Sequence, residues 1–314
     1  MRRALLVAVL CLTGCGGGRQ APVSEHPIAP PATREIEVTK IAGTDRSPRE
    51  VADAAAGVPV NGNPRGENSL VPESAFDGPI AAYRRYSARQ AAAMAARVTA
   101  LRQALAAGDR AAARRAWVQV YERYLLIGAA YGALGDLDSA ITGDRLALER
   151  GLWRDEPLPA LRPVAARLAR HVRQLRRTVP KVEITPLDYV IRAHEILEDA
   201  QRDMLSGVAA PYSGAGVRAT AASVDATDAV VATLRPLLAG HGAIASVEAG
   251  LLNLHRELDS IQRAHGGEWP ALDELSRSER QHLNGRLGAG LEILAGVPHA
   301  LETQYPPAIP ELRP

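Results

Sequence analysis

The sequence predicts an all-α fold, and three observations support this prediction. From Phe76 onward, long stretches of Ala, Leu, Arg and Glu are interrupted by Pro, Gly and Asp, which is the composition of a helical bundle. Aromatic residues make up only 4% of the chain, so Leu, Val, Ile and Ala must fill the core, which suits closely packed helices. Helix start and stop signals also follow one another along this part of the chain.

The first half of the helical region contains signals for five helices. A first helix is predicted from about Pro79 to Ala107 with a stop at Gly108, and Asp109 is placed to cap a second that reaches about Ala133. Helices at 137–153 and 160–178 follow, and Pro180 closes the latter. Thr185-Pro186 begins the next helix, because proline is tolerated in a first turn.

The remaining helices are separated by glycines. A break is expected at 207–216, followed by helices at 217–239 and 243–265. Ser276 and Glu279 have the spacing of a capping box, which opens a last helix that ends near Thr303. Large aromatic side chains are expected to anchor packing between helices, namely those of Phe76, Trp117, Tyr121, Tyr124, Tyr131, Trp153 and Trp269.

The N-terminal segment has the features of an export signal. Arg2 and Arg3 precede an apolar run, too short to span a bilayer, that ends at Leu12-Thr13-Gly14-Cys15. The Leu-x-Gly-Cys order resembles the lipobox of bacterial lipoproteins, in which the cysteine becomes the lipid-modified (diacylated, palmitate-bearing) first residue after cleavage. We therefore expect an exported protein, lipid-anchored to the cell membrane through Cys15 and facing the periplasm or the extracellular side.

Composition divides the chain into four segments. Residues 1–14 are the expected signal peptide, and residues 15–74, rich in Gly, Pro, Ser, Asn and charge, the lipid-anchored flexible tether. Residues 75–305 form the predicted helical domain, and 306–314 the C-terminal tail. Because Cys11 is removed with the signal and Cys15 is modified, no thiol remains for a disulfide or a cysteine-based metal site.

The charge balance gives no general argument for nucleic-acid binding, since the formal net charge is only +2. One basic cluster stands out, the arginines of 162–177, which alternate with apolar residues at helical spacing. A solvated helix face explains this pattern, and a weak attraction to anionic lipid headgroups is the alternative.

The residues do not suggest an enzyme. No Gly-x-Ser-x-Gly elbow and no His-Glu-x-x-His motif occurs, and no cysteine remains after processing to act as a nucleophile. Helical bundles can, however, hold metal ions through His and carboxylates one turn apart. His194 and Glu198 have this spacing, although a simple hydrogen bond on the bundle surface would produce the same pattern. His255 with Glu257 and Asp259 is a poorer set, because i,i+2 side chains diverge on a helix.

Several segments between residues 76 and 305 resemble the imelysin-like family, and within it the Efe-type (EfeO/EfeM-like) iron-uptake lipoproteins. These segments are Ala116-Trp117, Gly128 to Asp136, Leu148 to Trp153, Arg192 to Asp199, Leu283 to Gly285 and Leu291 to Ala295, in family order. The resemblance implies an imelysin-like helical domain made of two packed four-helix-bundle halves. It also implies a role in iron uptake, with an iron permease or a peroxidase as partner.

The sequence departs from the family at the positions of the proposed metal ligands. Where the family reads Gly-Phe-His-x-x-Glu, the histidine position is Leu146 and only Glu149 remains. Further upstream, the family's histidine and two glutamates correspond here to Tyr121, Arg123 and Leu125. Leucine and arginine cannot coordinate a cation, so an iron, copper or zinc ion would depend on Glu149, His194 and Glu198 in a degenerate site.

Two functions follow from these observations. The first is an accessory or binding component of iron or other metal uptake at the cell envelope. The second is a metal-free helical scaffold or protein-interaction module at the same location. Neither requires catalysis.

Overall fold

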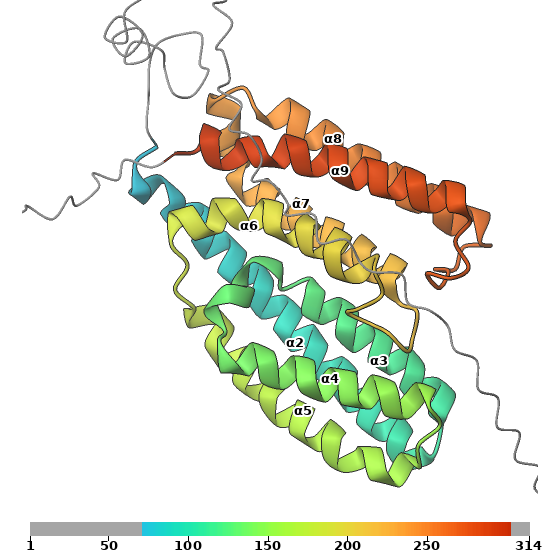
Figure 1. The fold of residues 1–314 in the computed structure, drawn as a ribbon. Coiled ribbons are helices and arrows are strands. Elements are labelled where there is room, and N and C mark those ends of the chain that lie inside the picture. Colours follow the sequence, from blue (N-terminus) through green and yellow to red (C-terminus); the bar gives the residue numbers. More distant parts are fainter. Residues whose placement is uncertain (1–70, 303–314) are drawn as a thin grey trace, which may run out of the picture. The chain divides into compact units, whose positions relative to one another are not determined.

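The computed structural model describes residues 71–302, in which eight α-helices and no β-sheet are found (Figure 1). The all-α prediction is therefore confirmed. The expected signal peptide, Cys15, most of the tether and the tail at 306–314 lie outside the described residues. Between residues 71 and 302, no helix combines the length and the apolarity needed to cross a bilayer.

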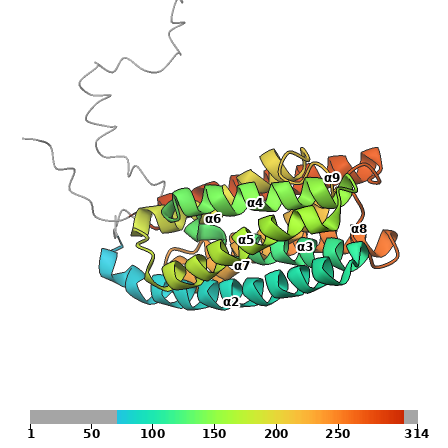
Figure 2. The same ribbon diagram turned by 90° about the horizontal axis from the view of Figure 1, so that it is seen from below.

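The first four helices form one packed group. They are α2 (Asp77–Ala107), α3 (Arg110–Leu125), α4 (Asp136–Trp153) and α5 (Leu158–Thr178), and a 3-10 turn, η1 (Glu73–Phe76), precedes them. The long helix α2 packs against both α3 and α5, and α4 packs against α5 and α3 (Figures 1 and 2). Their contacts form a closed ring, as in a four-helix bundle.

The last four helices form a second group in the same way. They are α6 (Pro186–Asp199), α7 (Gly216–Gly240), α8 (Ile244–Ala264) and α9 (Arg277–Ala300). Helix α9 lies between α6 and α8, and α7 contacts the other sides of these two helices. Helix α7 also packs on α2 and α3, which joins the groups. The two-bundle architecture implied by the family resemblance is thus present in the described chain.

The capping residues are those that the sequence predicts. The Asp109 side chain accepts a hydrogen bond from the Ala112 amide at 2.8 Å, at the start of α3. Thr185 caps α6 through the Asp188 amide at 3.1 Å. Ser276 and Glu279 form both hydrogen bonds of a capping box on α9. Each cap satisfies amides that have no partner within the helix.

One predicted helix ends earlier than expected. The second helix does not reach Ala133 but stops at Leu125, and a 3-10 segment, η2 (Gly128–Ala133), follows. Gly128 has a φ of +51°, which the α-helix excludes. A Cβ at this position would lie 3.0 Å from Ile196 Cδ1 and 3.2 Å from the Ala226 Cβ. The chain therefore breaks at Gly128 because helices α6 and α7 approach its backbone closely.

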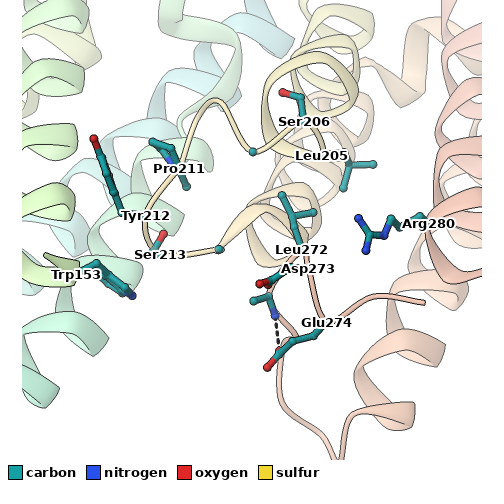
Figure 3. A pocket seen from close by; sticks show the side chains of 14 residues that line it. Trp153, Leu205, Ser206, Pro211, Tyr212, Ser213, Leu272, Asp273, Glu274 and Arg280 are labelled. Carbon is teal, nitrogen blue, oxygen red and sulfur yellow. Dashed lines mark hydrogen bonds between the residues drawn. The ribbon is translucent and has the colours of Figure 1, made fainter. Parts of the chain in front are cut away.

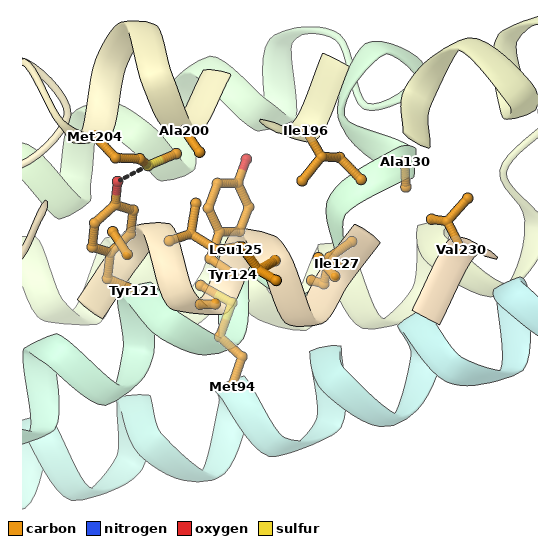
Figure 4. Packing of buried hydrophobic residues seen from close by; sticks show 14 of the residues in the cluster. Met94, Tyr121, Tyr124, Leu125, Ile127, Ala130, Ile196, Ala200, Met204 and Val230 are labelled. Carbon is orange, nitrogen blue, oxygen red and sulfur yellow. Dashed lines mark hydrogen bonds between the residues drawn. The ribbon is translucent and has the colours of Figure 1, made fainter. Parts of the chain in front are cut away.

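The core is aliphatic with a few buried aromatic anchors. Figure 4 shows Met94, Tyr121, Tyr124 and Leu125 beneath Ile196, Ala200 and Met204, at the junction between the two groups. Of the predicted anchors, four are buried and two are partly buried against the core. The buried ones are Phe76, Trp117, Tyr121 and Tyr124; the partly buried ones are Trp153 and Trp269. The side chain of Tyr131 is not among those described.

Candidate functional site

The structure does not bring the three predicted metal-site residues together. His194 and Glu198 lie one turn apart on α6, with His194 Nδ1 3.8 Å from the Glu198 carboxylate and half of the Glu198 side chain exposed. Glu149 lies on α4 and belongs to no described group of three or more ligand-bearing side chains. Cation binding by the His194–Glu198 pair alone stays a prediction.

Glu149 has a structural role that the sequence did not reveal. It is fully buried, and its Oε1 accepts hydrogen bonds from the Tyr212 amide at 3.2 Å, the Ser213 amide at 2.9 Å and the Ser213 hydroxyl at 2.6 Å. Its Oε2 is buried without a hydrogen-bond partner in the described chain. The carboxylate therefore fixes the loop between η4 (Ala200–Met204) and α7 against α4.

That loop forms one wall of a cavity of about 580 Å³. Figure 3 shows Pro211, Tyr212 and Ser213 on one side, Leu272, Asp273 and Glu274 on the other, and Trp153 and Arg280 at the edges. The two loops are tied by a hydrogen bond from the Leu272 amide to the Gly214 carbonyl at 3.3 Å. Glu274 in turn accepts from the Ala271 amide, and Arg280 donates to the Leu275 carbonyl. The polar groups of this wall thus brace the two loops.

A second pocket, of about 390 Å³, contains three of the five positions at which the family resemblance implies metal ligands. Tyr121, Leu125 and Leu146 all line it, although none carries an imidazole or a carboxylate. Arg123 is directed elsewhere and donates to the Gln90 side chain at 3.0 Å. Of the positions at which the family resemblance implies metal ligands, those in this pocket therefore supply no imidazole and no carboxylate.

A buried guanidinium is part of this pocket. Arg145 is 4% exposed, and its guanidinium carbon lies 4.0 Å from the ring centroid of Tyr121 and 5.8 Å from that of Trp117. It also donates to the Ala209 carbonyl at 2.8 Å. A cation–π contact at this distance already places a positive charge inside the pocket. A metal ion in this pocket would therefore have to compete with the guanidinium for the carboxylates that line it.

Acidic side chains surround the guanidinium. Asp138, Asp199 and Asp203 line the same pocket, and Tyr124 hydrogen-bonds to Asp138. Burial raises the pKa of Asp138, which the Arg145 charge partly offsets. Burial also raises the pKa of Asp199, and Asp203 adds to the effect while Arg202 opposes it. The positive charge of Arg145 is therefore offset by carboxylates within the same pocket.

A different cluster has the geometry of a cation site. Among residues 71–302, Asp225, Asp228 and His255 are the one group of three or more His, Cys, Asp or Glu whose ligand atoms all lie within 4.8 Å of one another. The two aspartates stand one turn apart on α7, and His255 comes from α8. His255 Nε2 contacts Asp228, and its Nδ1 lies 4.0 Å from Asp225.

The electrostatics of this cluster favour a positive charge at its centre. The hydrogen bond with Asp228 raises the pKa of His255, against the opposing effect of burial, and the charges of Asp225 and Asp259 raise it further. Burial raises the pKa of Asp225; the positive charges of His255 and Arg123 oppose this, and the negative charges of Asp228 and Glu122 add to it. A carboxylate pair that is partly desolvated and repels itself is stabilised by any cation between its members.

The sequence singled out His255 and indicated that Glu257 and Asp259 are poor partners for it. Glu257 and Asp259 lie on its own helix, and neither belongs to the cluster. The true partners are 27 and 30 positions upstream, where Asp225 and Asp228 show the i,i+3 spacing of a shared helix face. That spacing was a usable signal, but connecting it to His255 requires the packing of α7 against α8.

Comparison with known proteins gives weak but consistent similarity. No family model matches the chain. It is 25% identical over 239 residues to the iron uptake system component EfeO of Yersinia pseudotuberculosis, covering 70% of this chain and 63% of that protein. The EfeO of Yersinia pestis gives the same values. The iron uptake system component EfeM of Bacillus subtilis is 22% identical over 182 residues, which cover 54% of this chain and 47% of that protein. The chain thus spans less than two thirds of these relatives.

Proposed function

We propose that this protein is a component of a bacterial iron-uptake system that holds a divalent cation, with ferrous iron as cargo, at Asp225, Asp228 and His255. The observation that carries the proposal is the convergence of these three side chains from α7 and α8. The similarity to EfeO and EfeM, which are named as iron uptake components, supports iron as the cargo.

The donor set agrees with this cargo. Two carboxylate oxygens and one imidazole nitrogen combine the ligands that suit hard cations with the ligand that suits iron, zinc and copper. Mixed sets of imidazole and carboxylate hold ferrous iron at sites with open positions. Because all three side chains are partly solvent-accessible, water can complete the coordination and the ion can be released. Exchangeable binding suits a carrier better than a permanent cofactor would.

The cluster of Asp225, Asp228 and His255 lies elsewhere in the fold than the metal site that the family resemblance implies. Arg145 brings its own positive charge to the pocket lined by Tyr121 and Leu146, where it competes with a cation for the carboxylates of that pocket. The α7–α8 cluster lies in the second helical group and consists of two carboxylates and one imidazole. We propose that the metal function has moved from the first location to the second.

Export and anchoring belong to the same proposal. The Leu12-Thr13-Gly14-Cys15 signal supports lipidation of Cys15, which would hold the protein at the outer side of the cell membrane beside an iron permease or a peroxidase. The protein would then bind and pass on iron without being an enzyme. Labelling of cells with palmitate tests the anchor: the wild-type chain should incorporate label, and Cys15→Ser should not.

A metal-free scaffold is the second candidate function, favoured by the buried guanidinium of Arg145 at the family's metal position. Iron accumulation in cells separates the two. In a strain that lacks the chromosomal copy, Asp225→Asn with Asp228→Asn should restore no more iron uptake than the empty vector, whereas Glu198→Gln should restore it fully. Full restoration by the aspartate variant would favour the scaffold.

A further inference from the structure

Charge is unevenly distributed between the helices. Helix α5 contains six arginines and no acidic residue, and α2, which packs against it, contains five arginines and a single acidic residue, Asp77. Helix α6, in the other group, contains four acidic residues and one arginine. The near-neutral net charge of the chain therefore hides a basic surface on α5 and α2.

The arginines of α5 fall into two sets. Arg162 donates to the Leu105 and Ala106 carbonyls at the end of α2, and Arg167 pairs with the buried Asp144 at 3.0 Å, so both stabilise the fold. The remaining four, at 170, 173, 176 and 177, are exposed and have no hydrogen bond or ion pair in the described chain. These four are not needed for packing.

Three of them form a stripe. Arg170, Arg173 and Arg177 have i, i+3, i+7 spacing, which places them on one helix face. The opposite face, with Leu168, Val172 and Leu175, is buried in the core. With a rise of 1.5 Å per residue, the stripe extends over about 10 Å along the outside of the bundle. A flat anionic surface can contact all three guanidinium groups at once.

We infer that the exposed arginine stripe of α5 docks the helical domain on an anionic lipid bilayer. Charge complementarity is the argument for this occupant, because unpaired arginines on a smooth helix face are attracted to a layer of lipid phosphates. Helix α5 contains no Phe, Tyr or Trp on which nucleic-acid bases could stack. None of the large exposed apolar side chains of the described chain, Leu187, Val208 and Leu252, lies on α5, so the face also lacks the apolar anchors of a protein interface.

Docking through α5 would orient the domain. Helix α5 lies at one edge of the described structure and α8, which carries His255, belongs to the other helical group (Figure 1). With α5 on the membrane, the cluster of Asp225, Asp228 and His255 would stay away from the lipid phosphates, which would otherwise compete for a cation. This consequence rests on the proposed function, whereas the docking itself does not.

Vesicle sedimentation tests the inference. The full chain carrying Cys15→Ser is used, so that no acyl group can contribute, with vesicles of phosphatidylcholine alone or mixed with phosphatidylglycerol. We expect binding to the mixed vesicles only, weakening as salt increases. Arg170→Gln, Arg173→Gln and Arg177→Gln together should lower the partition coefficient roughly 100-fold, since each basic residue near the surface contributes about a factor of five.

The matched control removes the same charge elsewhere. Arg263, Arg277 and Arg286, on α8 and α9, are also exposed without an ion pair in the described chain, and changing all three to Gln should alter the partition coefficient by less than about twofold. If both triple variants lowered the partition coefficient equally, net charge alone would explain the binding, and the inference would be overturned. Unchanged binding of the α5 variant, binding to pure phosphatidylcholine, or retention by DNA without vesicle binding would also overturn it. No iron is present in this assay, so its failure leaves the proposed cation site untouched.

Discussion

The imidazole of His255 on α8 contacts the carboxylate of Asp228 on α7, 27 residues earlier in the chain. This contact joins two neighbouring helices of the second group and brings Asp225 within reach of the same ring. In the first group, the pocket lined by Tyr121 and Leu146 contains the buried guanidinium of Arg145. The first pocket thus already contains a positive charge, whereas the α7–α8 cluster combines two carboxylates with one imidazole.

Glu149 should be required for stability and not for cation binding. Glu149→Ala removes the acceptor of three hydrogen bonds and leaves the amides of Tyr212 and Ser213 without it, which should lower the free energy of unfolding by about 2–4 kcal/mol. Chemical denaturation measures this loss. Glu198→Ala, at an exposed position of α6, is the control and should change stability by less than about 0.5 kcal/mol. A stable Glu149→Ala protein that no longer binds cations would contradict this assignment.

Arg145 should act as a buried structural charge. Arg145→Met removes the contact with the Tyr121 ring and the hydrogen bond to Ala209, and it leaves Asp138 without a favourable charge, at a cost of about 3–5 kcal/mol. Arg150→Met on the same helix breaks only an exposed pair with Glu156 and should cost less than about 1 kcal/mol. Thermal unfolding of the two variants compares these costs. Similar melting temperatures would show that the buried guanidinium is dispensable.

Gly216 should not tolerate a side chain. A Cβ there would lie 2.3 Å from the Met204 carbonyl oxygen and 2.5 Å from Leu272 Cδ1, so Gly216→Ala forces the start of α7 away from η4 and should cost about 1–3 kcal/mol. Gly285→Ala, where nothing lies within 4 Å, should instead stabilise α9 by about 0.5–1 kcal/mol. The denaturation midpoint should fall in Gly216→Ala and rise in Gly285→Ala. Shifts of the same sign would contradict the close contact of Gly216 with Met204 and Leu272.

The capping box of α9 predicts a dependence of stability on pH. Hydrogen bonds from Ser276 lower the pKa of Glu279, and His265 lowers it further. Because the pKa is lower in the folded state, the stabilisation is complete above the unfolded value of about 4.3 and is lost as the pH falls through the folded value. Melting temperature measured against pH should fall less steeply at acid pH for Glu279→Gln than for wild type. Glu292→Gln, exposed on the same helix, should follow wild type, and parallel curves for all three would refute the linkage.

Local sequence signals predict the helices and their caps well. Asp109, Thr185 and Ser276 cap helices because their side chains reach amides two or three residues ahead, so the information lies within one turn. The early end of α3 is different, since the positive φ of Gly128 serves the approach of Ile196 and Ala226 from two other helices. The residues next to Gly128 in the sequence do not reveal that approach.

The candidate site shows the same limit. Local spacing correctly placed His194 and Glu198 on one face of α6, and Asp225 and Asp228 could have been placed on one face of α7 in the same way. Which histidine faces the two aspartates depends on how α8 returns along α7 after the turn at 241–243. The structural role of Glu149 could not be predicted for a related reason, because its partners, Tyr212 and Ser213, lie 63 and 64 residues away.

Cation titration of the Cys15→Ser chain tests the central claim most directly. Ferrous iron, handled without oxygen, and zinc are titrated by calorimetry at a pH above the pKa of His255, into wild type, Asp228→Asn and the control Glu198→Gln. We predict one site in wild type and in Glu198→Gln, with at least about 100-fold weaker binding in Asp228→Asn, because a lost ligand should cost no less than a lost supporting group. Binding that survives in Asp228→Asn, or no binding in wild type, would contradict a cation site at Asp225, Asp228 and His255.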